Sequence, residues 1–500
     1  MTSELNGGCD PSGVEGLDDI LRGGFPRHCL HLVAGASGTG KTTLAMQFLL
    51  RGAGLGESCL YIALSESKAE TARVAVSHGW DLTKINIVDL LPSEAHLASD
   101  SQLTVFNPSE FELGQVTEAI IKAVESSRPR RVVIDSLSEL RLIAQNSLRY
   151  RRQVLALKHF FASRDCTVLM LDDRSAAVDE DQLHSVAHGV VVLEQLVNQF
   201  GAERRRMRIS KMRGVAFRGG FHDFGIRHGG LDVYPRLVAS EHHETFPDEN
   251  LPSGNGQLDG LLGGGLPAGT STLLVGPAGT GKSTVATQFA VAAAARGERT
   301  ALFLFDENIG TLRSRSRKLG IPVERAIKDG LLTVQQIDPA ELSSGEFATA
   351  VRRASTGDDG GGKAARLVVI DSLNGYLNAM PEEKYLTAQL HELLAFLGQR
   401  GVVTIMTVSQ AGLVGQMASP VDATYLADNV ILFRYFEADG RVRRAISVVK
   451  KRNGHHERTI RELDMNQNGV LIGEPLVDFQ GILTGIPTYV GANRSLLERR

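Results

Sequence analysis

The sequence predicts an α/β fold with two tandem P-loop domains, each a mostly parallel, twisted sheet with helices on both faces. The phosphate-binding pattern G-x-x-x-x-G-K-[ST] occurs twice, at residues 35–42 and 276–283. Each copy lies between an apolar run typical of a strand and a stretch with helical periodicity, which is the context that a P-loop requires. Apolar strands that alternate with helices are typical of parallel sheets covered on both faces.

The elements around the two patterns are repeated as well. A Gly-x-x-x-Leu-Asp leader and a Gly-Gly-Phe/Leu-Pro turn precede each copy. We expect three matched strands in each copy, of which the second and third end in acidic residues. The expected strands are 29–34, 59–64 and 131–135 in the first copy, and 272–275, 300–305 and 366–371 in the second. We also expect helices at 42–51 and 283–296, directly after the loops. The chain is therefore predicted to contain one domain in duplicate.

Composition places the chain among ordinary globular proteins. Its 500 residues are 42% hydrophobic and 22% charged, and the formal net charge is −3. Such a charge does not attract nucleic acid or an anionic membrane in general. No apolar run reaches the roughly 20 residues of a membrane span, and the N-terminus lacks the features of a signal peptide. The four cysteines form no C-x-x-C pair, so we expect reduced thiols and a cytoplasmic location.

The expected domain boundaries follow from the repeat. We predict an N-terminal P-loop domain at 1–240, a polar, proline-containing linker at 241–253, a C-terminal P-loop domain at 254–478 and a tail at 479–500. One basic cluster, at 204–208, is more typical of a solvated strand than of a nucleic-acid surface.

The P-loops predict binding of ATP with Mg²⁺. Backbone N–H groups wrap the polyphosphate, the lysine neutralises β- and γ-phosphate oxygens, and the Ser or Thr hydroxyl ligates the metal. Aspartates that end apolar strands beside the loops suit the same metal. The expected nucleotide-binding residues are Gly38, Thr39, Gly40, Lys41, Thr42 and Thr43, and Gly279, Thr280, Gly281, Lys282, Ser283 and Thr284. The expected metal-binding residues are Thr42, Asp135, Ser283 and Asp371.

Acids at the ends of the second strands are the candidate catalytic residues. Phosphoryl transfer to water or a hydroxyl needs a carboxylate that orients the nucleophile and takes its proton. Glu66, Asp306 and Glu307 are placed for this role, although solvated turn carboxylates are the alternative. Ser65 stands in the first copy where Asp306 stands in the second.

Two basic triplets occur late in the copies and in register with each other: Lys211-Met212-Arg213 and Lys450-Lys451-Arg452. One interpretation is a solvated strand end. The other is a cation that reaches a neighbouring subunit's γ-phosphate, as an arginine finger does.

Several motifs together point to one family: the paired P-loops and leaders, Ser77-His-Gly-Trp80, Asp135-Ser-Leu, Asp371-Ser-Leu, Lys211-Met212-Arg213-Gly214, Asp428-Asn-Val-Ile-Leu-Phe and Arg444-Ala-Ile-Ser-Val-Val-Lys450. On these motifs, from about residue 12 to about residue 478, the chain resembles the KaiC family, the double-domain RecA-superfamily ATPases and autokinases of the cyanobacterial clock, and more closely its bacterial homologues outside cyanobacteria.

The resemblance implies two RecA-like domains, a homo-hexamer with ATP at subunit interfaces, and a KaiB-like or signalling protein as a candidate partner. It also implies that both triplets and Arg444 lie at a subunit interface, and that Ser77 and Trp80 lie near the nucleotide of the first domain.

The chain departs from the family at two places. KaiC has a Glu-Glu pair after each second strand, whose first Glu is catalytic, and the matching residues here are Ser65 and Asp306. The first domain is therefore expected to hydrolyse ATP poorly or to use Glu66. The positions of the family's Ser-Thr phosphoacceptors hold Thr424 and Tyr425. We expect one of these to accept phosphate from the second site, and the alternative is that autophosphorylation is lost.

The function expected from all this is a ring ATPase with serine/threonine-type autokinase activity in its C-terminal domain, acting as a signalling or clock-like regulator. Two alternatives are a RecA-type DNA-dependent ATPase, which would need a basic groove, and a scaffold that binds ATP for assembly and catalyses little.

Overall fold

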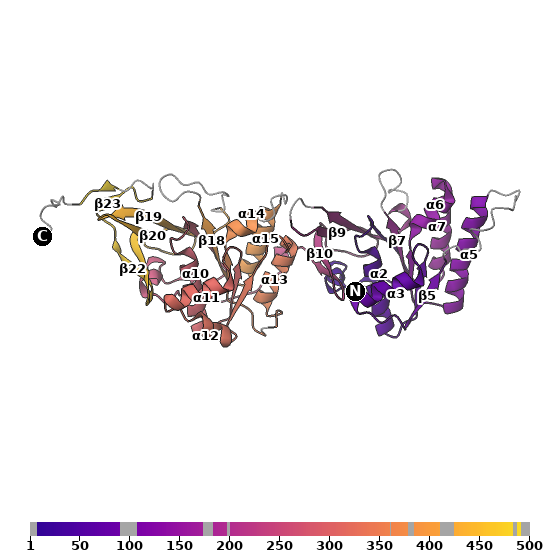
Figure 1. Ribbon diagram of the computed structural model, residues 1–500, viewed down its shortest axis with the longest axis horizontal. Coiled ribbons are helices and arrows are strands. Elements are labelled where there is room, and N and C mark those ends of the chain that lie inside the picture. Colours follow the sequence, from indigo (N-terminus) through magenta and orange to yellow (C-terminus); the bar gives the residue numbers. More distant parts are fainter. Residues whose placement is uncertain are drawn as a thin grey trace. The chain divides into compact units, whose positions relative to one another are not determined.

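The computed structural model describes residues 8–90, 108–173, 184–197, 201–360, 362–378, 385–410, 425–483 and 488–491. The chain divides into two compact units, Met1–Arg236 and Leu237–Arg500 (Figure 1). Within the described ranges, no helix is long and apolar enough to cross a membrane.

The first unit is built on a nine-stranded sheet with the order β11-β10-β9-β8-β3-β7-β6-β4-β5. The strands from β8 to β5 in this order are parallel, and β9, β10 and β11 are antiparallel to their neighbours. The strands are β3 (Leu30–Gly35), β4 (Cys59–Ala63), β5 (Ile85–Asp89), β6 (Arg131–Asp135), β7 (Thr167–Asp173), β8 (Gly189–Leu196), β9 (Arg204–Met212), β10 (His222–Arg227) and β11 (Gly230–Tyr234), with a separate ladder of β1 (Cys9–Asp10) and β2 (Phe25–Pro26). The helices are α1 (Glu15–Ile20), α2 (Lys41–Gly54), α3 (Lys68–His78), α5 (Pro108–Ser127), α6 (Leu137–Ala144) and α7 (Ser147–Ala162).

The second unit repeats this plan in the order β16-β15-β17-β18-β14-β19-β20-β21-β22. Its strands are β14 (Ser271–Gly276), β15 (Thr300–Leu304), β16 (Leu332–Gln336), β17 (Leu367–Asp371), β18 (Val403–Ser409), β19 (Asn429–Ala438), β20 (Arg441–Lys451), β21 (Arg461–Asn466) and β22 (Gly469–Pro475). Short ladders pair β12 (Asn250–Leu251) with β13 (Leu266–Pro267), and β23 (Phe479–Gln480) with β24 (Thr488–Tyr489). The helices are η1 (Ala239–Glu241), α9 (Gly256–Leu261), α10 (Lys282–Ala295), α11 (Ile309–Lys318), α12 (Val323–Lys328), α13 (Ser344–Thr356), α14 (Leu373–Asn378) and α15 (Leu386–Gln399).

Each sheet has a hydrophobic core on both of its faces. In the second unit, α10, α11 and α12 pack on one face and α13, α14 and α15 on the other (Figure 1). In the first unit, α1 and α2 cover one face, and α5, α6 and α7 cover the other. Successive residues of the central strands alternate between the two cores, since side chains of a strand point to opposite faces. The predicted α/β architecture, with two tandem RecA-like domains, is confirmed.

The leader sequence forms a turn with the same hydrogen bond in both units. The backbone N–H of Ser12 donates to Asp18 Oδ1 at 2.7 Å, and that of Ser253 donates to Asp259 Oδ1 at 2.6 Å. The aspartate of the repeated leader therefore has a structural role.

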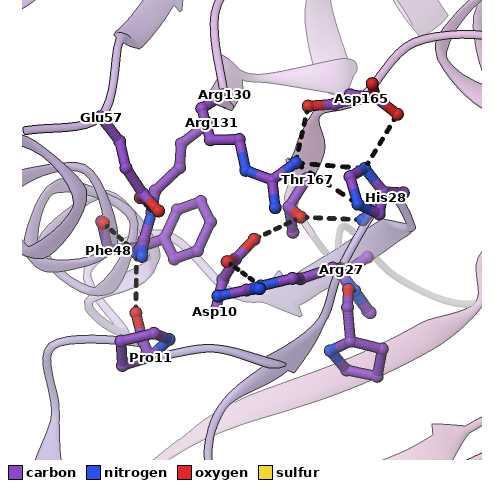
Figure 2. Close-up of polar contacts among 12 residues, drawn as sticks. Asp10, Pro11, Arg27, His28, Phe48, Glu57, Arg130, Arg131, Asp165 and Thr167 are labelled. Carbon is purple, nitrogen blue, oxygen red and sulfur yellow. Dashed lines mark hydrogen bonds and ion pairs between the residues drawn. The ribbon is translucent and has the colours of Figure 1, made fainter. Parts of the chain in front are cut away.

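A buried arginine connects α2 to the sheet of the first unit through hydrogen bonds (Figure 2). Arg131 is fully buried at the start of β6, and its Nε lies 2.5 Å from Glu57 Oε2. Its Nη1 donates to the carbonyls of Pro11 at 2.7 Å and Phe48 at 2.8 Å. Because Phe48 belongs to α2, this network holds the helix that follows the P-loop. Leu367 starts the matching strand of the second unit.

The residues predicted as a linker, 241–253, lie in the second unit and contact it. Arg400 Nη1 lies 2.5 Å from Glu244 Oε1, and Leu251 is buried in the core under α9 and α10. The division between the units falls at 236/237, a few residues before the start of this segment.

Candidate nucleotide-binding sites

The two P-loops join a central strand of each sheet to a helix, β3 to α2 and β14 to α10. Gly38 and Gly40 have φ values of 78° and 97°, and Gly279 and Gly281 have values of 78° and 103°. Glycine adopts this left-handed conformation without the steric cost of a side chain. The loop backbone therefore requires glycine at these predicted positions.

The P-loop threonines and lysines bind their own loops. Thr39 Oγ1 donates to the carbonyl of Ala36, and Thr280 Oγ1 to that of Pro277, both at 2.8 Å. Lys41 Nζ donates to the carbonyls of Gly35 at 3.0 Å and Ala36 at 2.9 Å. Each lysine thus has its ammonium group beside the loop that would hold phosphate.

The second lysine is held in the same way. Lys282 Nζ donates to the carbonyls of Gly276 at 2.8 Å and Pro277 at 2.7 Å. Burial lowers the pKa of Lys282 to about 8, although Asp371 acts in the opposite direction. A bound polyphosphate would supply the negative charge that this buried cation lacks.

Each site contains the hydroxyl and the carboxylate expected for a metal. Thr42 Oγ1 donates to Asp135 Oδ2 at 2.7 Å, and Ser283 Oγ donates to Asp371 Oδ1 at 3.0 Å. Tyr61 and Thr407 donate a further hydrogen bond to the same aspartates, at 2.8 and 2.5 Å. Burial raises the pKa of both aspartates. This set of oxygen donors fits Mg²⁺.

In the first site, one carboxylate oxygen of Glu66 lacks a hydrogen bond from the described residues. Glu66 Oε2 is buried and accepts no hydrogen bond among the described residues. Burial raises the pKa of Glu66, and the negative charges of Asp135, Glu70 and Asp173 raise it further. Ser65 beside it is exposed.

In the second site, Glu307 and Asp306 both accept hydrogen bonds from other side chains. Arg315 donates to Glu307, from Nε to Oε1 at 3.1 Å and from Nη2 to Oε2 at 2.8 Å. Asp306 is exposed and accepts a hydrogen bond from Ser372 Oγ. Ser372 directly follows Asp371, so Asp306 lies beside the candidate metal site.

The basic triplets lie at the sheet edge opposite to the P-loop of their own domain. Met212 pairs with Gly189, which pairs with His31 at the start of β3, whereas the loop begins after Gly35. The separation along the strand is roughly 13 Å. Lys451 pairs with Asn429, which pairs with Thr272 near the start of β14. Within one copy of the chain, the triplets are therefore remote from the site of the same domain.

The triplet side chains contact nearby backbone and acids. Lys211 Nζ donates to the carbonyls of His184 and Ala187, at 2.6 and 2.8 Å. Arg213 donates to the carbonyl of Ser185, and Met212 is buried in the core. In the second triplet, Lys450 donates to the Ala427 carbonyl, Lys451 to the Leu262 carbonyl, and Arg452 pairs with Asp428 at 2.9 Å.

The remaining predicted residues are spread over both units. Ser77 is exposed at the end of α3, while Trp80 stacks on His78 with ring centroids 4.4 Å apart and donates to the Gly229 carbonyl. Arg444 lies on β20, opposite Tyr435 of β19. The hydroxyl of Tyr435 donates to the carbonyl of the P-loop residue Ala278.

The candidate phosphoacceptors lie at the border of a described range. Tyr425 is 59% exposed. Thr424 lies outside the described residues.

The sequence patterns missed two charged residues of these sites. Asp173 Oδ1 lies 2.5 Å from Lys41 Nζ, and Arg315 binds Glu307. Asp173 ends an apolar strand, the same signal that identified Asp135, so it could have been found. Arg315 is one of three arginines in α11, and no motif distinguishes it from the others.

Comparison with known proteins agrees with this geometry. The family model described as "ATPase: KaiC" matches residues 10–238 and 251–477, and so matches both domains. "Circadian clock oscillator protein KaiC" of Thermostichus vulcanus is 28% identical over 499 residues, covering 97% of this chain and 92% of the relative. "Circadian clock protein KaiC3" of Synechocystis sp. is 29% identical over 490 residues, with 96% and 94% covered. "Circadian clock oscillator protein KaiC" of Synechococcus elongatus is 28% identical over 487 residues, with 95% and 91% covered. Since the two family matches each contain one of the two P-loop sites, the chain belongs to the KaiC family of ATPases.

Proposed function

We propose that this KaiC-family ATPase binds ATP with Mg²⁺ at both P-loops and hydrolyses it at both. The observation that supports this is that each site is complete, with a buried lysine and a hydroxyl hydrogen-bonded to a buried aspartate. Thr42 with Asp135, and Ser283 with Asp371, would hold Mg²⁺, which supplies positive charge to the β- and γ-phosphate oxygens when bound.

The acids supply the proton chemistry in this proposal. A water oxygen bonds to the γ-phosphorus while the bond from phosphorus to the β-γ bridging oxygen breaks, and the water gives its proton to a carboxylate. Glu66 takes this role in the first site, because one of its oxygens accepts no hydrogen bond from the residues that the structure describes. Asp306 takes it in the second.

We further propose that copies of the chain assemble into a hexamer with ATP between subunits. The triplets support this, because they lie at the edge of the sheet remote from the P-loop of their own domain, where they could contact a nucleotide held by another subunit. Native mass spectrometry with and without ATP tests the assembly. Arg213→Ala and Arg452→Ala should each lower turnover, and mixing either protein with a P-loop variant should restore part of it. Failure of such mixtures to recover activity would contradict shared sites.

The second domain is proposed to transfer phosphate to its own chain at Thr424 or Tyr425, in addition to water. Tyr425 is exposed, as an acceptor must be. Phosphopeptide mapping after incubation with Mg·ATP should find one of the two residues modified, and Lys282→Ala should abolish the label while Lys41→Ala should not. A map without either modification would contradict the autokinase.

A DNA-dependent ATPase is less well supported. Arginines of the basic cluster on β9 are paired with acids, Arg205 with Glu203 at 3.1 Å and Arg206 with Glu194 at 2.8 Å. These pairs leave less charge for a phosphate backbone. Turnover that is unchanged by DNA is therefore expected. The relatives named as circadian clock proteins suggest a timing or signalling regulator that other proteins recognise.

A further inference from the structure

An arginine outside the P-loop motif connects the second acid of the C-terminal site to the P-loop helix. Two nitrogens of Arg315 bind the two carboxylate oxygens of Glu307 separately, and its Nη1 donates to Thr284 Oγ1 at 3.0 Å. Both side chains are largely buried, with 22% of Arg315 and 18% of Glu307 exposed. Thr284 follows the metal-site hydroxyl of Ser283 on α10. The contact therefore fixes Glu307 against α10, the helix that follows the P-loop.

A bidentate arginine contact fixes the orientation of the carboxylate that it binds. The planar guanidinium matches the carboxylate in a fixed fork, and such charge-assisted bonds are stronger than neutral ones. Each oxygen of Glu307 keeps a further lone pair, so the contact acts by position: Glu307 would have to leave Arg315 before its carboxylate could turn toward a nucleophile elsewhere in the site. Glu307 also interacts electrostatically with Asp371 on β17, and Asp371 interacts with Lys282.

The first domain lacks this arginine. Arg315 stands eight residues after Glu307, and the residue at the same interval after Glu66 is Val74. One oxygen of Glu66 has no hydrogen bond among the described residues. The acids acting on it are Asp135, Glu70 and Asp173, and the nearby cation Lys41 is paired with Asp173. In the described part of the chain, one oxygen of this glutamate accepts no hydrogen bond where the arginine is absent, and both oxygens are bound where the arginine is present.

Asp306 remains available in the second site. It is exposed, and its described hydrogen bond comes from the neutral hydroxyl of Ser372. A hydroxyl can orient a carboxylate while leaving its charge in place.

We propose that Arg315 is a positioning residue that withdraws Glu307 from proton transfer, so that Asp306 accepts the proton in the second site, whereas the first site, with Val74 in place of Arg315, works through Glu66. This inference rests on the proposed function, ATP hydrolysis at both sites. It assigns different carboxylates to two sites with the same P-loop motif.

The test uses the full-length chain in two backgrounds: Lys41→Ala, which isolates the second site, and Lys282→Ala, which isolates the first. In the first background, Asp306→Asn should lower turnover by about 10²- to 10⁴-fold, the usual contribution of a positioned base. Adding Arg315→Val should free Glu307 and recover at least about tenfold of that loss, with a changed pH profile because a different carboxylate is titrated. Adding Glu307→Gln to this double variant should remove the recovery. Arg315→Lys keeps the charge beside Glu307 but loses the bidentate fork, so it should recover less than Arg315→Val.

The reciprocal test is made in the first site. Val74→Arg should lower turnover at least about tenfold by binding Glu66, while Val74→Met, of similar length without charge, should not. Retained ATP binding in each variant shows that the site is folded. Equal activity of Asp306→Asn with and without Arg315→Val, or equal effects of Val74→Arg and Val74→Met, would overturn the inference alone. No hydrolysis in either background would overturn the proposed function and the inference with it.

Discussion

The first and second nucleotide sites share a P-loop lysine and a hydroxyl–aspartate pair, but the charged groups around these differ. In the first site Lys41 is paired with Asp173, and one oxygen of Glu66 accepts no hydrogen bond among the described residues. In the second site Ser409 ends the strand where Asp173 ends the first, and Arg315 binds Glu307. The two sites therefore share the proposed phosphate-binding motif, while residues outside it give their acids different hydrogen-bond and charge partners.

The largest expected effect tests Glu66. In the Lys282→Ala protein, Glu66→Gln should lower ATP turnover by about 10²- to 10⁴-fold, because the first site would lose its only proposed base. Burial and nearby acids raise the pKa of Glu66. Turnover should therefore be lost as the pH falls through a value above the ordinary glutamate pKa of about 4.3. Steady-state rates from pH 4 to 8 provide the measurement. Ser65→Ala is the control, and an equal loss in that variant would contradict the assignment.

The second prediction compares the strands that carry the metal-site aspartates. Arg131→Ala should destabilise the first domain by about 3–5 kcal/mol, because it removes the charge partner of Glu57 and the donor to the carbonyls of Pro11 and Phe48. The chain has one tryptophan, Trp80, in the first unit, so its fluorescence reports urea unfolding there. Leu367→Ala alters the matching strand of the second unit and should leave this transition in place. An unchanged transition in Arg131→Ala would show that the buried network contributes little.

The third prediction concerns proton uptake at the second P-loop. The pKa of Lys282 is lowered to about 8, and bound phosphates should raise it. Above pH 8, Lys282 then takes up a proton when ATP binds. The affinity for ATP should be highest below this pH and should weaken as the pH rises, by at most about tenfold per pH unit. Calorimetric titration of the Lys41→Ala protein at pH 9, in buffers with different ionisation enthalpies, measures the uptake. Lys282→Arg should show none, since arginine stays charged. Zero uptake with Lys282 present would contradict the prediction.

The smallest effect concerns Asp173. Its carboxylate is 41% exposed, so solvent weakens the pair with Lys41 to the range of ~0.2–1 kcal/mol. Asp173→Ser should therefore strengthen ATP binding at the first site by about 1.4- to fivefold, because the carboxylate no longer competes with phosphate for Lys41. The reciprocal Ser409→Asp should weaken binding at the second site by a similar factor. Equilibrium titration with a fluorescent ATP analogue measures both, and changes of the same sign would refute competition.

Much of the fold and the core of each site could be predicted because they depend on local patterns. The glycines, lysine and hydroxyl of a P-loop are close in sequence, and an aspartate at the end of a parallel strand must lie at the loop edge of the sheet. Asp173 obeys the same rule. The triplets at 211–213 and 450–452 were recognised by repetition, but their place at the opposite edge follows from the antiparallel pairing of β9 with β8 and of β20 with β19.

The partners of the acids could not be predicted in this way. Of the three arginines in α11, Arg313 pairs with Glu324, Arg317 is exposed, and Arg315 faces Glu307. Helix phase and the packing of α11 beside α10 decide between them. The sequence by itself determined the α/β class, the duplication and the two phosphate loops, because these depend on short-range backbone and hydrophobic patterns. Only the tertiary structure decided which carboxylate is free in each site, because charge interactions depend on distances in space between residues that no motif connects.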